Sequence, residues 1–170
     1  MKKIALTLTI ASLALFSNAQ ELALDTYSYH TAVGLRGIGT SGLTVKHFTK
    51  QDVALEGIVG LWSNAISATL LYEKHANAFD VEGLRWYYGG GGHVVARTHN
   101  HNHHKHYYEH HIGHDNGAAA FGLDGIIGIE YKIKPIPFAV SADLKPNIEV
   151  SSTGSAFLRF DPGLGIKVTF

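Results

Sequence analysis

The 170-residue sequence predicts an all-β protein, an eight-stranded antiparallel up-and-down transmembrane β-barrel. Three observations lead to this fold class. Eight segments alternate between apolar and polar residues, which is typical of strands whose two faces meet different surroundings. The chain contains 19 glycines and only four prolines. After residue 19, no apolar run reaches the roughly 20 residues that a membrane-spanning helix needs, so we expect any membrane crossing to use strands.

The first 19 residues are predicted to be a cleavable signal peptide. Lys2 and Lys3 precede an apolar run at 4–16, and Ser17-Asn18-Ala19 places small residues where a signal peptidase cuts. The run of about thirteen residues is too short to cross a bilayer as a helix. A retained N-terminal anchor is the alternative. We expect residues 20–170 to form one exported domain.

Four strands are predicted in the first half of this domain, at 29–36, 42–48, 53–61 and 67–73. In each, apolar residues occupy one face and small or polar residues the other. The apolar faces hold Tyr29, Thr31, Val33 and Leu35, then Leu43 and Val45, then Val53, Leu55, Val59 and Leu61, and finally Ala68, Leu70 and Tyr72. Ile58 departs from the pattern, because it falls among the polar positions of the third segment.

Four more strands are predicted at 82–95, 121–132, 138–145 and 163–170. Their apolar faces hold Leu84, Trp86, Tyr88 and Val94, then Phe121, Leu123, Ile127, Ile129 and Tyr131, then Phe138, Val140, Ala142 and Leu144, and finally Leu164, Ile166, Val168 and Phe170. Ile126 falls on the polar face of the sixth segment. The four consecutive glycines at 89–92 fit either a continuous strand or a bulge.

Short and long connections are expected on opposite ends of the barrel. The connections at 49–52, 75–80 and 133–137 are short, whereas 97–117 and 146–161 are expected to be long loops. Outer-membrane barrels have short turns on the periplasmic side and longer loops outside. We therefore expect both ends of the domain on the periplasmic side, with 97–117 as an extracellular loop.

The polar face is predicted to line the lumen, because its charges balance. Enclosed charges must be paired or hydrated, since an isolated buried charge is very costly. The expected lumen charges are Arg36, Lys46, Arg85, Lys145 and Lys167, against Glu56, Glu73, Asp124, Glu130 and Asp143. An aromatic girdle is expected at the periplasmic end of the outward face, formed by Tyr29, Tyr72, Tyr131, Phe138 and Phe170. A serine at lumen-facing Gly128 should be tolerated better than an arginine at outward Leu123 or Ile127.

The chain resembles the small eight-stranded bacterial outer-membrane β-barrel proteins over its whole mature length. The terminal pattern Leu164, Ile166, Val168 and Phe170 is similar to the C-terminal signal that such proteins present to the barrel-assembly machinery. The stretches DVEGLRWYYGGGGH and GLDGIIGIEYK also look like those of an uncharacterised group of these barrels. The resemblance implies a monomer in the outer membrane of a Gram-negative cell, with membrane lipid and the assembly machinery as partners. It implies no particular function, because this fold serves many roles.

The longest predicted outer loop contains eight of the twelve histidines. Neutral imidazoles bind late first-row metals such as Zn, Ni or Cu. The candidate ligands are His99, His101, His103, His104, His106, His110, His111 and His114. The alternative is a hydrophilic loop that shields the surface.

The composition and the absence of known motifs argue against several classes of function. The chain has no cysteine, and its 14 Lys and Arg balance its 14 Asp and Glu, so neither thiolate chemistry nor a basic nucleic-acid surface is expected. No nucleophile motif is visible, and a balanced charge ladder explains Asp124 and Glu130 without catalysis. We expect a non-enzymatic barrel with a filled lumen and a structural or surface-binding role. Metal capture as the main role and a lipid-modifying enzyme are the alternatives.

Overall fold

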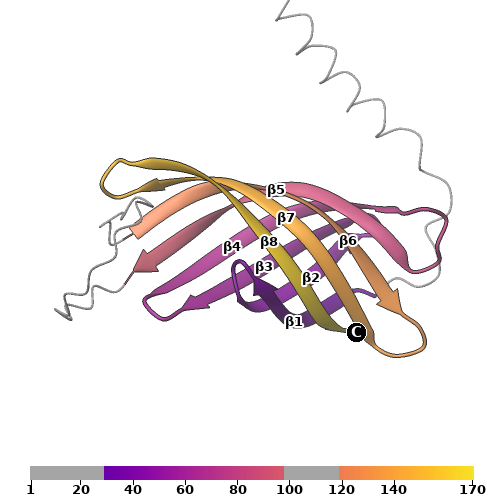
Figure 1. Ribbon diagram of the computed structural model, residues 1–170. Coiled ribbons are helices and arrows are strands. Elements are labelled where there is room, and N and C mark those ends of the chain that lie inside the picture. Colours follow the sequence, from indigo (N-terminus) through magenta and orange to yellow (C-terminus); the bar gives the residue numbers. More distant parts are fainter. Residues whose placement is uncertain (1–28, 98–118) are drawn as a thin grey trace, which may run out of the picture.

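The computed structural model describes residues 29–97 and 119–170, which form a closed barrel of eight antiparallel strands. Each strand pairs with the next one along the chain, and β1 pairs with β8 to close the barrel (Figure 1). The strands are β1 (Thr31–Ile38), β2 (Gly42–Lys50), β3 (Val53–Trp62), β4 (Ala65–Asn77), β5 (Leu84–Arg97), β6 (Ala119–Ile133), β7 (Phe138–Ser151) and β8 (Ala156–Thr169). No helix in the described part of the chain is long and apolar enough to cross a membrane. The predicted signal peptide lies outside the described residues.

All eight predicted strands are confirmed, and most are longer than their alternation suggested. The four glycines of β5 belong to a continuous strand and not to a bulge. Gly89 to Gly92 pair in unbroken register with β4 on one side and β6 on the other. A Cβ at Gly91 would lie 1.9 Å from the carbonyl oxygen of Leu70, so glycine lets the two strands approach closely at this point.

The predicted long loop at 146–161 is wrong. β7 continues to Ser151 and β8 begins at Ala156, and the two strands pair from Phe138↔Val168 to Val150↔Ala156. Pro146 lies where the β6–β7 pairing is interrupted between Asp124↔Asn147 and Ile127↔Leu144. An interruption accommodates proline because its nitrogen has no proton to donate. Pro146 therefore does not end β7, and Pro162 lies within β8, where it pairs with Leu144.

The two ends of the barrel differ. The turns β2–β3, β4–β5 and β6–β7 share one end with the C-terminus, which we call the terminal end (Figure 1). The other end, the loop end, carries the β1–β2, β3–β4 and β7–β8 turns and the strand ends Arg97 and Ala119. The wall is uneven there, because β1–β8 pairing stops at Ile38↔Gly163 whereas β7–β8 pairing continues to Val150↔Ala156. The short β1–β2 hairpin leaves the loop end open on one side.

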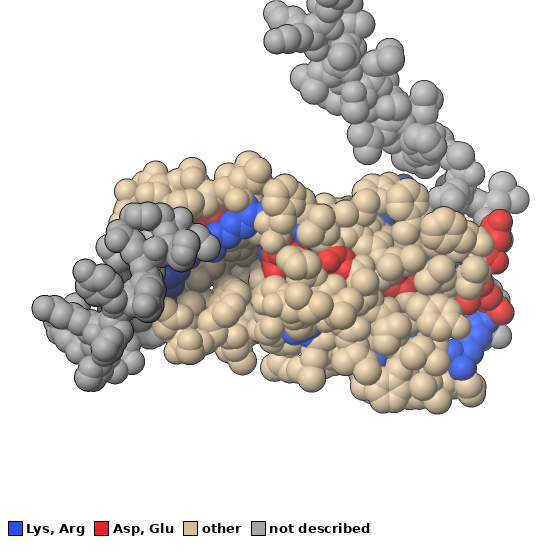
Figure 2. All heavy atoms as spheres, in the orientation of Figure 1, with Lys and Arg blue, Asp and Glu red and all other residues tan. Residues whose placement is uncertain are grey.

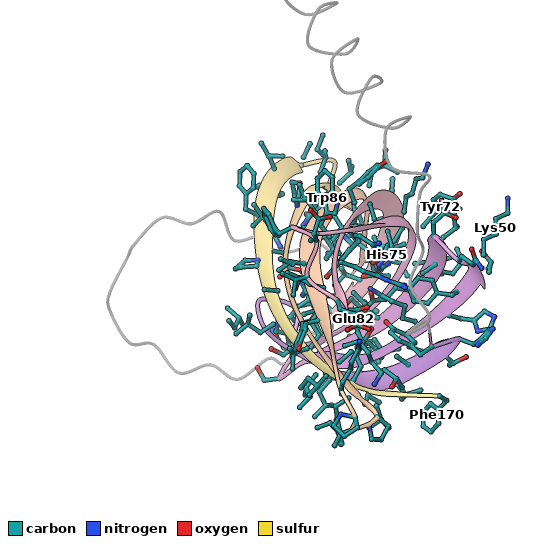
Figure 3. The ribbon with its side chains drawn as sticks, turned by 90° about the vertical axis from the view of Figure 1, so that its right-hand side faces the viewer. Lys50, Tyr72, His75, Glu82, Trp86 and Phe170 are labelled. Carbon is teal, nitrogen blue, oxygen red and sulfur yellow. The ribbon has the colours of Figure 1, made fainter. Side chains whose placement is uncertain are left out.

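Polarity is inverted relative to a water-soluble domain. Among the described residues, buried polar and charged side chains outnumber buried apolar ones, and large apolar side chains cover the outside. Leu123 is 74% exposed, whereas Lys46 and Glu73 are fully buried. On the face in Figure 2, uncharged side chains cover most of the wall. In Figure 3, His75 lies inside the ring of strands while Tyr72 and Phe170 point away from it.

The expected aromatic girdle needs one correction. Tyr72, Tyr131 and Phe170 are exposed on the outside and Phe138 is half-buried, but Tyr29 is buried and donates a hydrogen bond to Glu130 at 2.5 Å. Tyr29 precedes the first residue of β1, so the alternation of that strand does not fix where its side chain points. Burial, together with the neighbouring Glu130 carboxylate, raises the pKa of the Tyr29 phenol well above its ordinary value.

Candidate functional site: the barrel lumen

A compact ion-pair network fills the lumen toward the terminal end. Lys46 of β2 lies at its centre, with its Nζ atom 2.9 Å from Glu56, 2.7 Å from Glu73 and 3.4 Å from Glu130. Lys167 of β8 pairs with Glu56 and Glu130 at 3.1 and 3.6 Å. Thr44 donates a further hydrogen bond to Glu56. We call this group the terminal network, and its ion pairs join side chains from β2, β3, β4, β6 and β8.

An aromatic column lies beside the terminal network. The rings of Tyr29 and Phe48 meet edge to face at 5.1 Å, and Phe48 contacts His75 at 4.8 Å between ring centroids. His75 in turn stacks on Tyr87 at 5.1 Å with an interplanar angle of 19°. Nε2 of His75 lies 3.2 Å from Glu73. The column therefore packs against the charged side chains of the terminal network.

An apolar layer interrupts the lumen charges. Ile58, Leu71, Tyr87 and Ile126 are all buried and pack together. Ile58 and Ile126 are the two isoleucines that fell among the polar positions in the sequence. Both side chains point inward, as the alternation indicated, and this apolar layer explains why apolar residues occupy those positions. The Lys46 ammonium lies 4.2 Å from the centre of the Tyr87 ring, while the Tyr87 hydroxyl donates to Asp143 at 3.2 Å. Tyr87 thus joins the terminal network to a second one.

The second network, the loop-end network, extends from the apolar layer to the open end. Arg36 pairs with Asp143 at 2.6 Å and Asp161 at 3.2 Å, and Lys145 pairs with Asp124 at 2.8 Å and Asp161 at 3.2 Å. The remaining pairs join His93 to Asp124 and Glu149, and Arg97 and Arg159 to Glu149. Its four Arg and Lys residues equal its four Asp and Glu residues, so it is balanced when His93 is neutral.

Lumen glycines make space for the large members of this network. A Cβ at Gly163 would lie 2.4 Å from the Arg36 guanidinium, and one at Gly122 would lie 2.5 Å from Cε1 of His93. Contacts this short do not occur between real side chains, so a substitution would push the charged groups out of place. The glycine-rich polar face is therefore a requirement of packing in a narrow barrel.

A polar cavity of about 310 Å³ opens at the loop end. Charged members of the loop-end network form part of its wall, and hydroxyl, amide, aromatic and aliphatic residues, the last including Val95 and Pro162, form the rest. The uncharged polar part consists of Thr40, Ser67, Thr69 and Asn147, with Trp62 at the β3–β4 turn. In Figure 2 the left-hand end of the barrel is hollowed, with blue side chains at its edge.

All ten predicted lumen charges lie inside the barrel. The predicted metal ligands, His99, His101, His103, His104, His106, His110, His111 and His114, lie outside the described residues. Within residues 29–97 and 119–170, no group of three or more His, Asp or Glu side chains is arranged to hold a metal ion. Asp124 and Glu130 belong to different networks, and each carboxylate is satisfied by ion pairs.

Sequence reasoning missed Glu149, Asp161 and Arg159 as lumen residues, because 146–161 was assigned to a loop. Continuing the alternation of β7 beyond Lys145 would have placed Asn147 and Glu149 on the inner face. His93 lies on the inner face of β5, and its bridge between Asp124 and Glu149 could not be predicted because it depends on the pairing of three strands.

Comparisons with known proteins identify no relative. No family model, no curated protein and no solved structure matches the chain. Function must therefore be argued from the barrel itself.

Proposed function

We propose that this protein is a monomeric barrel of the bacterial outer membrane with a filled lumen and a structural or surface-binding role. The observation that carries the proposal is the inverted polarity of the barrel. Outward residues such as Leu70, Leu123 and Phe121 are 62 to 74% exposed, and the lumen holds charges that a soluble barrel would turn outward. Apolar surface of this extent is unfavourable in water, whereas lipid covers it without cost.

The closed backbone also supports membrane insertion. A bilayer core offers no hydrogen-bond partners, so only helices and closed barrels satisfy every backbone group there. β1 and β8 close this barrel from Ala32↔Thr169 to Ile38↔Gly163. The backbone of Phe170 adds hydrogen bonds to Thr31 at 2.8 and 3.2 Å. The turns are short at both ends, apart from the 21-residue connection between β5 and β6. That connection would face outward and the terminal end would face the periplasm, as in outer-membrane barrels with long outer loops.

Detergent dependence tests this proposal directly. The full-length chain should be exported, fractionate with outer membranes and require detergent for solubility. The folded barrel should also migrate differently on a gel before and after boiling, because it resists denaturation by cold detergent. A protein that stays monomeric and soluble without detergent would contradict the proposal.

A second candidate role is capture of transition metals by the eight histidines between β5 and β6. Ala96 and Ala119 pair directly across the two strands, so the segment that holds these histidines begins and ends at one point of the rim. Three or four imidazoles complete a tetrahedral site, and eight residues provide redundancy.

Calorimetric titration with Zn, Ni and Cu tests the metal role. The full chain should bind metal near neutral pH and release it on acidification, because protons compete for the imidazole nitrogens. A variant lacking residues 99–114 should fold but lose binding, whereas single histidine substitutions should change affinity little. Equal binding by the deletion variant and the full chain would contradict the metal role.

A further inference from the structure

We infer that the loop-end cavity binds a small, uncharged, hydroxyl-rich molecule of monosaccharide size. This inference gives the surface-binding role proposed above a site and a ligand class. A volume of about 310 Å³ is at the lower end of the range of ligand pockets, which begins at roughly 300 Å³. The cavity therefore fits one small polar molecule and not a folded partner or a lipid.

A buried hydroxyl without a partner marks the cavity as a site. Ser67 of β4 is only 4% exposed, lines the cavity, and its Oγ atom makes no hydrogen bond within the described residues. A buried polar group without a partner costs free energy. A ligand hydroxyl in the cavity would supply the missing bond. Thr69 on the same strand and Asn147 of β7 line the same space, so the ligand meets hydroxyl and amide groups from two walls.

The charges of the wall argue against a charged ligand. Asp161 is already satisfied by Arg36, Lys145 and Thr40, whose hydroxyl and backbone nitrogen donate at 2.7 and 2.6 Å. Of the charged side chains that line the cavity, Lys145 and Arg159 balance Glu149 and Asp161 when His93 is neutral, and in that state the cavity offers no net charge to select an ion. Uncharged groups are left to recognise the ligand, and sugar hydroxyls both donate and accept.

The opening provides an aromatic surface and a route in. Trp62 at the end of β3 lines the cavity and is 44% exposed, so its ring can cover the apolar face of a sugar. Arg159 stands at the same opening, held 5.7 Å above the ring of Phe157 and 3.6 Å from Glu149. Because the β1–β2 hairpin is short, Gly39 and Thr40 form a low rim on this side of the cavity.

Ligand binding is tested on the folded full-length barrel in a zwitterionic detergent without a sugar headgroup. The probes are glucose, galactose and N-acetylglucosamine, with glucuronate, glucosamine and inorganic phosphate as charged counterparts, followed by ligand-observed NMR titration. We expect saturable binding of at least one uncharged sugar and none of the charged probes. Offering the bound sugar free and as the terminal residue of an oligosaccharide distinguishes a soluble nutrient from a surface glycan.

The matched variants are Ser67→Ala and Ser141→Ala. Both serines are buried on the lumen face, but only Ser67 lines the cavity. Ser67→Ala should weaken binding about three- to tenfold, as expected for one uncharged hydrogen bond, and Ser141→Ala should not. Asn147→Leu, which keeps the side-chain size, should also weaken binding, with circular dichroism confirming the fold.

Three results would overturn the inference: no uncharged sugar binds the wild-type barrel, only charged probes bind, or both serine variants bind alike. Because the assay needs only a folded barrel, in detergent or in buffer, its failure is distinct from failure of the membrane proposal.

Discussion

At the scale of single residues, Lys46 shows how the lumen is held together. Its side chain is completely buried and its ammonium contacts Glu56, Glu73 and Glu130. Ion pairs of this kind contribute little net stability, since burying the charges offsets their attraction. Removing one member of such a pair is nevertheless costly, because the other charge then stays buried without a partner.

Lys46→Met should therefore destabilise the barrel strongly, by about 3–5 kcal/mol. The control is Lys74→Met, because the Lys74 side chain is 43% exposed and 4.0 Å from Asp52, and its loss should change stability by less than about 0.5 kcal/mol. Urea unfolding in lipid vesicles measures both. Similar stability of the two variants would mean that the terminal network is hydrated and not buried.

Much of the lumen could be predicted at this scale. Strand alternation identified ten charged residues that the structure places inside. It failed for Tyr29, which lies just outside β1, and for Glu149 and Asp161, which fall in the segment 146–161 that is predicted to be a loop. The partner of each charge could not be predicted, because pairs such as Arg36 with Asp143 and Asp161 join distant parts of the chain. The loop-end cavity has no sequence signal for the same reason.

At the scale of the strands, the outward face of β6 is the sharpest test of which side meets lipid. Leu123→Arg places a charge where the side chain is 74% exposed, at a cost of about 2–4 kcal/mol near the bilayer midplane. Ile127→Arg should have a similar cost, because the Ile127 side chain is 51% exposed on the same face. The control is Phe79→Arg, because Phe79 lies in the β4–β5 turn and is 84% exposed. Folding yield into vesicles should drop for both β6 variants only, and equal yields would contradict lipid contact.

Gly128→Ser, expected from the sequence to be mild, is not a suitable control. A Cβ at Gly128 would lie 2.6 Å from the Tyr87 ring and 2.8 Å from the backbone oxygen of Ala142. The backbone atom cannot move away easily, so we expect Gly128→Ser to disturb the apolar layer. Alternation indicates which face a residue occupies, but the space beside it depends on side chains from other strands.

The last strand carries a prediction about assembly. The Phe170 side chain is 72% exposed and points away from the barrel, so it contributes little to the folded lumen. Phe170→Lys should therefore reduce insertion in cells several-fold while leaving refolding into detergent nearly unchanged. Western blots of outer-membrane fractions and gel mobility of refolded protein measure the two effects. Normal insertion of Phe170→Lys in cells would contradict recognition of the terminal strand by the assembly machinery.

At the scale of the whole molecule, we expect the lumen to be closed to ions. Eight strands enclose a space that side chains can fill, whereas porins with about 16 strands leave a water-filled channel. Here the apolar layer of Ile58, Leu71, Tyr87 and Ile126 lies in the lumen, and the terminal and loop-end networks occupy its two sides. A permeating ion would have to displace this layer and separate buried ion pairs.

Purified protein in planar bilayers should therefore show no stepwise conductance at salt concentrations where a porin, measured in parallel, gives clear steps. Ile58→Ala with Ile126→Ala should remain closed as well, because Lys46, Tyr87 and Asp143 still bridge the two networks. Stable conductance steps from the wild-type barrel would show that the lumen opens. The protein would then be a channel, and the proposal of a filled structural barrel would be wrong.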